Sequence, residues 1–344
     1  MVKKLIVILV LIGVIGISLY IYVDSQSLRE DVFEANYNLK VLKKDPNQEL
    51  KESSVFYGKD RLNVLLIGRD TSNIRRFNGQ GGFNTDVMIL ISVDTVSNRI
   101  LFTSVPRDLW INGNKINALN ILYGEDVLID AFEKVTGQDV DGTISIDFDG
   151  FIWLVDAFGG VPVEVQRSFS DYTFPVFDDS GITTISFTEG TEKMDGMRAL
   201  TFARSRKGTN GEGSDLMRAK RQHLILQGMA NALEQPGSIF DLDDIPGMYE
   251  LLTQHMETTL TIGDVYYLWD FYRDKDLYSA ESFVIDGEYV YHPGMYPASP
   301  YTAWVFVSRD GDFSRLHRDI DAKLSGTFEI EEEPSVDGAE ESGL

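Results

Sequence analysis

Two aspartates stand beside expected strand ends, where they could hold a metal ion. Asp70 follows the apolar run 61–68, and Asp86 precedes the apolar run 87–93. If these runs are antiparallel neighbours, both carboxylates lie at one edge of a sheet, the usual place for a site in an α/β fold. Carboxylate oxygens with no nearby His or Cys suit a hard cation such as Mg²⁺ or Mn²⁺. The alternative is that each Asp only caps a loop, which is common.

A local reversal of charge lies at residues 198–221. The whole chain has a formal net charge of −23, yet this segment has seven basic and two acidic residues: Arg198, Arg204, Arg206, Lys207, Arg218, Lys220 and Arg221 against Glu212 and Asp215. Guanidinium groups match phosphate oxygens in a bidentate way. The segment is therefore a candidate phosphate site, and a solvated basic helix face is the alternative.

The spacing within this segment places several basic groups together. Arg204 and Arg206 share one face if their segment is extended. Arg218, Arg221 and Gln222 share a face of the helix expected at 214–233. They lie in its first turns, where the helix dipole favours an anion.

Two further basic residues follow the apolar run 100–105. Arg107 stands in the sequence Pro-Arg-Asp, and Lys115 precedes Ile-Asn. Arg107 could form an ion pair with Asp108 or contact a phosphate at the same sheet edge. Together the residues describe a pyrophosphate site in which two carboxylates hold a divalent cation and basic groups neutralise the phosphate oxygens. Phosphoryl transfer needs chiefly this positioning and charge stabilisation.

Composition and missing motifs exclude other chemistries. The chain has no cysteine, which excludes disulfides, thiolate zinc sites and cysteine catalysis. It has no GxSxG elbow, no GxxxxGK[ST] loop and no HExxH motif, and its four histidines are not at ligand spacing. A net charge of −23 repels duplex DNA, so nucleic acid is not an expected partner.

Elements that could position these residues alternate along the chain. Strand-like runs lie at 61–68, 87–93, 100–105, 143–147 and 161–165, with a hairpin joining the second and third. Helical patterns lie at 125–136, 150–158 and 214–233, the last with Ser214 or Asp215 as N-cap. Strands that alternate with helices predict an α/β domain with a mixed central sheet and helices on both of its faces.

The N-terminus predicts a membrane anchor. Residues 5–23 are uncharged, and as a helix they would span roughly 28 Å, close to a bilayer core. Lys3 and Lys4 precede the run, so residues 1–4 are expected in the cytoplasm and the rest of the chain outside it, in a single-pass protein of the cell membrane. A cleaved signal peptide is the alternative, but no small-residue cleavage pattern follows.

The rest of the chain divides into three parts. Residues 24–58 are expected to form a polar juxtamembrane stalk, and residues 59–325 an extracytoplasmic catalytic domain. Residues 326–344 are acidic and poor in large apolar side chains, which predicts a disordered tail.

Seven motifs in a fixed order carry a resemblance to a known family. In chain order they read NVLLIGRD, TDVMILISVD, ILFTSVPRDLWI, NKINALN, FDGFIWLVDAFGGVPVEV, ALTFARSRKG and SDLMRAKRQHLIL. With the single anchor before them, they resemble the LytR-CpsA-Psr family of cell-envelope phosphotransferases. The match runs from about Asn63 to about Leu324.

The resemblance implies a fold, a reaction and roles for residues. The fold is a three-layer α/β/α domain with an apolar pocket for a polyprenyl chain. The reaction is Mg²⁺-assisted transfer of a glycan phosphate from a polyprenyl-pyrophosphate carrier to an envelope acceptor, chiefly peptidoglycan. Asp70, Asp86 and Arg107 match residues with catalytic roles, the two Asp as metal ligands. Pyrophosphate binding is implied for Arg107, Lys115, Arg204, Arg206, Arg218, Arg221 and Gln222.

One departure from the family pattern removes a positive charge. The family usually has Arg two residues before the second Asp, and this chain has Asn84. Two alternatives to transfer stay open: net hydrolysis of polyprenyl pyrophosphates with water as acceptor, and a non-catalytic lipid-binding or regulatory role.

Overall fold

The computed structural model describes residues 47–78, 84–177, 180–232, 245–273, 278–296 and 303–328. The anchor expected at 5–23, most of the expected stalk and the tail from 329 onward lie outside these ranges. Within the described ranges, no helix combines the length and apolar character that crossing a membrane requires.

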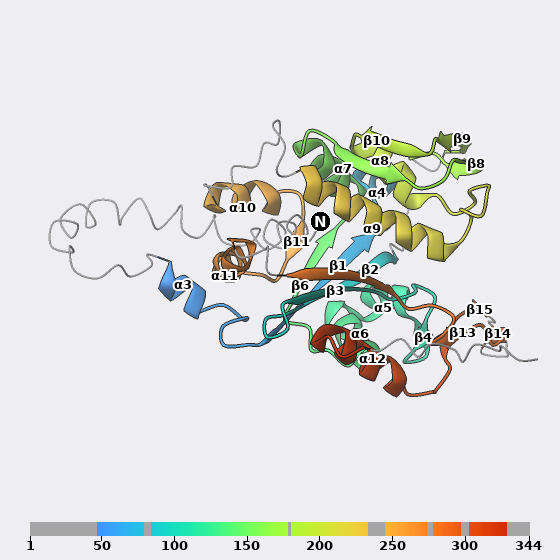
Figure 1. The fold of residues 1–344 in the computed structure, drawn as a ribbon. Coiled ribbons are helices and arrows are strands. Elements are labelled where there is room, and N and C mark those ends of the chain that lie inside the picture. Colours follow the sequence, from blue (N-terminus) through green and yellow to red (C-terminus); the bar gives the residue numbers. More distant parts are fainter. Residues whose placement is uncertain are drawn as a thin grey trace, which may run out of the picture.

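A mixed six-stranded sheet forms the centre of the domain (Figure 1). Its order is β11 (Glu257–Thr258), β6 (Gly142–Ile146), β1 (Arg61–Arg69), β2 (Thr85–Asp94), β3 (Arg99–Ser104) and β12 (Ser279–Val284). β1 pairs parallel with β6, and β3 pairs parallel with β12, whereas β2 runs antiparallel to both of its neighbours. The ends of β1, β3, β6 and β12 therefore lie at the same sheet edge as the start of β2.

The remaining described strands form small two-stranded sheets. The pairs are β4 (Trp110–Ile111) with β5 (Asn114–Lys115), β7 (Val161–Val165) with β10 (Gly190–Met194), β8 (Phe169–Pro175) with β9 (Ile182–Phe187), β13 (Val290–Tyr291) with β16 (Val307–Ser308), and β14 (Met295–Tyr296) with β15 (Ala303–Trp304). The strand expected at 161–165 is thus present as β7, but it lies outside the central sheet.

Helices cover both faces of the central sheet (Figure 1). On one side lie α7 (Phe148–Ala157), α8 (Gly196–Arg204), α9 (Asp215–Ala232) and α10 (Ile245–Thr253). On the other lie α5 (Ile116–Tyr123), α6 (Glu125–Thr136) and α12 (Ser314–Ser325). Short helices α3 (Gln48–Glu52) and α4 (Asn73–Phe77) and the helix α11 (Ile262–Arg273) complete the described set.

Alternating side chains divide the core between the two faces. On β1, Val64 points into the core beneath α7, α8 and α9, whereas Leu65 and Ile67 point into the core beneath α5, α6 and α12. This period of two is the expected behaviour of a strand that is buried on both faces. The predicted three-layer α/β/α arrangement is confirmed for the described domain.

Local sequence signals explain where the helices begin and end. The Asp147 carboxylate accepts a hydrogen bond from the Gly150 N–H and caps α7, and Asp195 caps α8 through the Arg198 N–H. The α6 helix ends at Gly137, whose φ of 70° is in the left-handed region that glycine tolerates best. The helices expected at 125–136, 150–158 and 214–233 correspond to α6, α7 and α9.

Part of the segment assigned to the stalk packs on the domain. The Phe56 side chain is fully buried, and α3 lies against α11. The Asp264 carboxylate, which is buried, accepts hydrogen bonds from the Ser54 hydroxyl at 2.7 Å and from the Val55 N–H at 2.8 Å. The described fold therefore includes residues before 59, the expected domain boundary.

Replacing Asp264 should loosen this segment. We expect Asp264→Ala to lower the free energy of unfolding by about 3 kcal/mol, because it leaves buried donors without their charged acceptor. Chemical denaturation measures the change, and limited proteolysis should show faster cleavage near residue 55. Asp60→Ala, at an exposed position, is the matched control. Equal stability of the two variants would contradict the role of Asp264.

Candidate active site

The sheet edge brings the predicted carboxylates together. Asp70 follows β1, and Asp86 is the second residue of β2. The Asp70 N–H donates to the Asn84 carbonyl at 3.0 Å, which ties the two strand ends to each other. Because β1 and β2 are antiparallel neighbours, Asp70 and Asp86 line one cavity. The predicted location of both aspartates at one edge of the sheet is confirmed.

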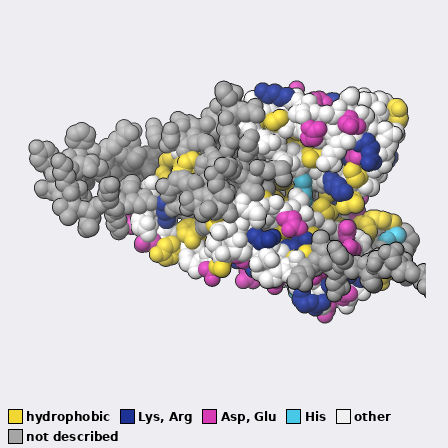
Figure 2. All heavy atoms as spheres, viewed as in Figure 1, with side chains coloured by type: hydrophobic (Ala, Val, Ile, Leu, Met, Phe, Trp, Pro, Cys, Tyr) yellow, Lys and Arg dark blue, Asp and Glu magenta, His cyan; other side chains and the backbone are white. Residues whose placement is uncertain are grey.

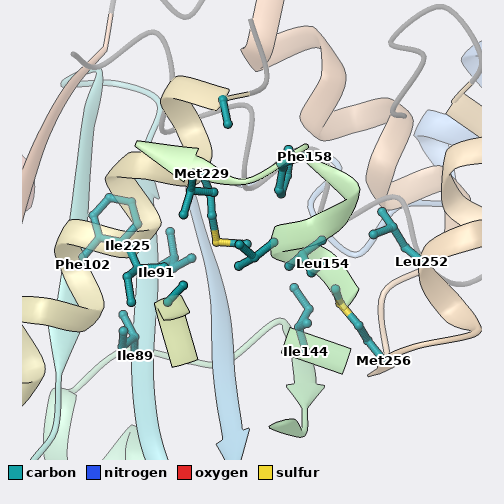
Figure 3. Close-up of a cluster of buried hydrophobic side chains, with 14 of the residues drawn as sticks. Ile89, Ile91, Phe102, Ile144, Leu154, Phe158, Ile225, Met229, Leu252 and Met256 are labelled. Atoms are coloured by element: carbon teal, nitrogen blue, oxygen red, sulfur yellow. The ribbon is translucent and has the colours of Figure 1, made fainter. Parts of the chain in front are cut away.

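This first cavity has a volume of about 500 Å³ and a deep apolar part. Its apolar walls come from the sheet, α7, α9 and the residue before β11, and include Ile89, Ile144, Leu154, Ile225, Met229 and Met256. Figure 3 shows these six side chains within the larger apolar cluster that lies between the strands and the helices. A chain of hydrocarbon is the kind of ligand that such walls would bury favourably.

The mouth of the first cavity is charged. Six basic and four acidic side chains line it: Arg69, Arg75, Arg204, Arg206, Lys207 and Arg218 against Asp70, Asp86, Asp147 and Asp171. This local excess of positive charge opposes the charge of the whole chain, which is −23. On the face seen in Figure 2, acidic and basic side chains of the described residues are interspersed. The cavity mouth therefore favours an anion, and its apolar interior favours a lipid.

Asp86 lies between two arginines. Arg107 Nη1 donates to both Asp86 oxygens at 2.7 Å, and Arg218 Nη1 lies 3.8 Å from Asp86 Oδ2. Burial works to lower the pKa of Arg107, but the Asp86 charge and hydrogen bonds outweigh it and raise that pKa. Burial lowers the pKa of Arg218 despite the nearby Asp215 and Asp86 carboxylates. Arg107 also forms the ion pair with Asp108 that the sequence suggested, with its Nε 3.5 Å from Asp108 Oδ2.

Sequence reasoning missed Arg75, which lies at the cavity mouth. Its Nη1 donates to the Asp70 carboxylate at 2.7 Å and to the Asp70 carbonyl at 2.6 Å. Arg75 comes from α4, whose N-cap Ser72 accepts from the Arg75 N–H. The pair of arginines shortly after Asp70 was the available signal. Arg75 brings a positive charge to the end of β1, close to where Asn84 lacks one.

Arg204 and Arg206 both line the first cavity, although not from an extended segment. The expected extended conformation is wrong at Arg204, because α8 continues through that residue. The Arg204 guanidinium stacks 4.3 Å from the Phe148 ring centroid. Buried Asp171 fixes the following turn by accepting hydrogen bonds from the Ser205 hydroxyl at 2.9 Å and the Lys207 N–H at 3.1 Å.

Three residues expected to bind pyrophosphate do not line the first cavity: Arg107, which pairs with Asp86 and lines a smaller adjoining cavity, Lys115 and Arg221. Lys115 Nζ donates to the Asp108 carboxylate at 2.6 Å, so it supports the segment that carries Arg107. Arg221 is 2% exposed, and its guanidinium donates to the Glu212 carboxylate at 2.8 Å and to the Phe202 carbonyl at 3.0 Å. The charges of Lys115 and Arg221 are used within the protein, where they hold the loops that carry other arginines. Direct phosphate contact by either residue stays a prediction.

Gln222 and His223 are neighbours on α9 with different surroundings. Gln222 lines the first cavity, as expected for the face it shares with Arg218. His223 Nε2 lies 2.7 Å from the Ser104 hydroxyl oxygen at the end of β3. Burial lowers the pKa of His223 to about 4. This histidine is consequently neutral near pH 7 and adds no charge to the site.

The protein supplies only some of the oxygen ligands that a hard divalent cation needs. No group of three or more His, Cys, Asp or Glu side chains is arranged for a metal among the described residues. Asp70 and Asp86 supply oxygen donors from one cavity wall. Mg²⁺ commonly binds through one or two carboxylates together with substrate phosphates and water. Asp70 and Asp86 would supply the one or two carboxylates that such a cation needs.

A solved structure has a fold similar to that of this protein. The structure of TagT bound to LIIa-WTA aligns with a TM-score of 0.56 and 21% identity, over 83% of this chain and 94% of that one. At this identity the likeness shows the fold.

Sequence relatives carry transferase names. The polyisoprenyl-teichoic acid–peptidoglycan teichoic acid transferase TagU of Oceanobacillus iheyensis is 27% identical over 227 residues, which are 63% of this chain and 64% of that protein. TagT of Bacillus subtilis, named for the same activity, is 28% identical over 247 residues, 70% of this chain and 72% of that protein. The match with TagU thus spans less than two thirds of its length.

The family model covers most of the domain. It matches residues 23–301, which include both aspartates, the arginines at the cavity mouth and the apolar walls. The chain therefore belongs to the LytR_cpsA_psr family.

Proposed function

We propose that this protein transfers a glycan phosphate from a polyprenyl-pyrophosphate carrier to a hydroxyl of a cell-envelope acceptor, most simply peptidoglycan. The observation that carries the proposal is a single cavity with an apolar interior and a mouth rich in arginine. A polyprenyl chain suits the interior and a pyrophosphate suits the mouth. Relatives named as teichoic acid transferases support the same reaction.

The proposed step is a displacement at the phosphorus that carries the sugar. The acceptor oxygen forms a bond to this phosphorus, and the bond to the bridging oxygen breaks. Polyprenyl phosphate leaves with the electron pair. Arg204, Arg206 and Arg218 line the cavity where charge builds up on the phosphate oxygens, so their role is to stabilise that charge.

We propose that Asp70 and Asp86 also hold Mg²⁺ or Mn²⁺. Such a cation would neutralise further charge on the pyrophosphate. Arg75 and Arg107 hold the two carboxylates in place through hydrogen bonds of 2.7 Å. They limit the rotation of each carboxylate before substrate arrives, which lowers the entropic cost of ordering the site.

The sequence supports a location at the cell membrane. A hydrophobic N-terminal segment at 5–23 with preceding lysines would anchor the chain in the cell membrane, with the domain outside the cytoplasm. The polyprenyl carrier would then reach the cavity from the adjacent bilayer. Hydrolysis, with water as the acceptor, uses the same site and is distinguished by measuring products with and without a glycan acceptor.

Loss of the central charges should stop transfer. We expect Asp86→Ala and Arg204→Ala each to reduce transfer by at least about 10²-fold, since each removes a group that orders or neutralises the pyrophosphate. The measurement is transfer of a lipid-linked glycan to peptidoglycan, with circular dichroism to verify folding. Chelation with EDTA should have a similar effect, and added Mg²⁺ should reverse it.

Arg198→Ala is the matched control for these variants. Arg198 belongs to the same basic segment, but it pairs with Glu192 at 2.6 Å and does not line the cavity. Full transfer by Asp86→Ala and Arg204→Ala would contradict the assigned site, and so would an equal loss in Arg198→Ala.

Arg75 should contribute positive charge that Asn84 does not provide. We expect Arg75→Ala to lower transfer at least about tenfold, because it removes a guanidinium that lines the mouth and holds Asp70. Arg76→Ala is the control, since Arg76 does not itself line the cavity, although it pairs at 2.7 Å with Asp147, which does. Equal rates for the two variants would show that Arg75 has no such role.

Replacing Arg221 should lower the stability of the fold. We expect Arg221→Ala to destabilise the fold by about 3–5 kcal/mol, because it leaves the buried Glu212 carboxylate without its cation. The double variant Arg221→Met/Glu212→Leu removes both charges and should recover most of that loss. Thermal or chemical unfolding of the three proteins measures this. An unchanged stability of Arg221→Ala would contradict the structural role.

A further inference from the structure

A second, smaller cavity lies on the other side of Asp86. Its volume is about 180 Å³. It is lined by the segment after β3, the end of β12 and the first turns of α9, whereas the first cavity lies over β6, β1 and β2. Asp86, Val87, Arg218 and Gln222 line both cavities. The two cavities therefore adjoin at these residues, and the proposed phosphate position lies beside them.

The geometry of the proposed reaction suggests a role for the second cavity. In phosphoryl transfer, the attacking and leaving oxygens lie roughly in line on opposite sides of the phosphorus. The leaving polyprenyl phosphate belongs to the first cavity, because that cavity has the apolar interior. The attacking hydroxyl must then arrive from the opposite side, across the start of β2. The second cavity opens on that side.

The lining of the second cavity suits a neutral sugar. The carboxylates of Asp215 and Asp286 and the hydroxyl of Ser104 can accept hydrogen bonds from sugar hydroxyls. Val290 and Phe306 provide apolar surface for the faces of a sugar ring. His223, the neighbour of Ser104, has a pKa lowered by burial to about 4 and so adds no positive charge. Four carboxylates line this cavity against the two guanidinium groups of Arg107 and Arg218, and this excess of negative charge disfavours a second phosphate there.

The position on the surface allows a large acceptor. Leu216, at the start of α9, lines the cavity and is 40% exposed. In Figure 2 hydrophobic side chains reach the surface near this end of α9, with charged side chains around them. A cavity of about 180 Å³ suits one sugar unit, while the rest of a polymer stays in solvent.

We infer that the second cavity binds the acceptor sugar, a hydroxyl-bearing unit of the envelope glycan, and directs its hydroxyl at the phosphorus held beside Asp86. This inference rests on the proposed transferase function. The acceptor oxygen–phosphorus bond forms, the bond from phosphorus to the bridging oxygen breaks, and polyprenyl phosphate takes the electron pair. The hydroxyl proton is released to solvent.

Filling the second cavity from two walls tests the inference. Ala219 lines only the second of the two cavities, so Ala219→Phe should obstruct it and spare the first. Gly287→Phe does so from the opposite wall, where a Cβ would meet no atom within 4 Å. The control is Lys220→Phe, which puts the same side chain at an exposed position of α9 outside both cavities.

The assay measures transfer from a short-chain polyprenyl-pyrophosphate disaccharide to soluble peptidoglycan fragments at varied acceptor concentration, and donor binding separately. We expect the two blocking variants to raise the acceptor KM at least about tenfold, with donor Kd within about twofold of wild type. Lys220→Phe should match wild type in both.

Three results would overturn the inference. The first is an acceptor KM that is unchanged in both blocking variants. The second is donor binding that weakens together with transfer, which would make this cavity part of the donor site. The third is a wild-type protein that binds donor but transfers nothing to any glycan fragment; that result refutes the proposed function itself, and the first two leave it standing.

Discussion

The site depends on keeping like charges close together beside an apolar cavity. Arg107 and Arg218 both lie within 4 Å of Asp86, and both are largely buried. Buried guanidinium groups are costly unless carboxylates and hydrogen bonds compensate them. Asp86 supplies that compensation at the start of β2. The position of this one carboxylate follows from the antiparallel pairing of β1 and β2, so the register of the sheet determines the electrostatics of the site.

The surrounding loops are held by the same kind of interaction. Asp171 binds the turn after α8 through Ser205 and Lys207, and Arg221 binds it from the other side through the Ser205 carbonyl. Lys115 holds Asp108 beside Arg107. Charged residues in this chain thus have two roles. Some line the cavity. Others form hydrogen bonds to protein groups and so hold the cavity-lining residues in place.

Local patterns in the sequence predicted part of this arrangement. The hairpin of β2 and β3 and the apolar run of β1 were visible in the sequence. They placed Asp70 and Asp86 at one edge only on the condition that β1 and β2 are antiparallel neighbours, which the structure meets. Helix spacing correctly gave the shared face of Arg218 and Gln222. It could not distinguish Arg221, because spacing defines a face of a helix and not what packs against it.

Long-range pairing was beyond local patterns, and the second cavity depends on it. β12 joins β3 in parallel, with Ser279 opposite Arg99, and no turn or period in the sequence specifies a partner so distant. Yet this pairing brings Asp286 and Gly287 to the edge where β2 begins. A strand from late in the chain therefore closes the far side of the site. The two-sided access that an in-line displacement requires comes from β2 lying between β1 and β3, with one cavity on each side of its first residues.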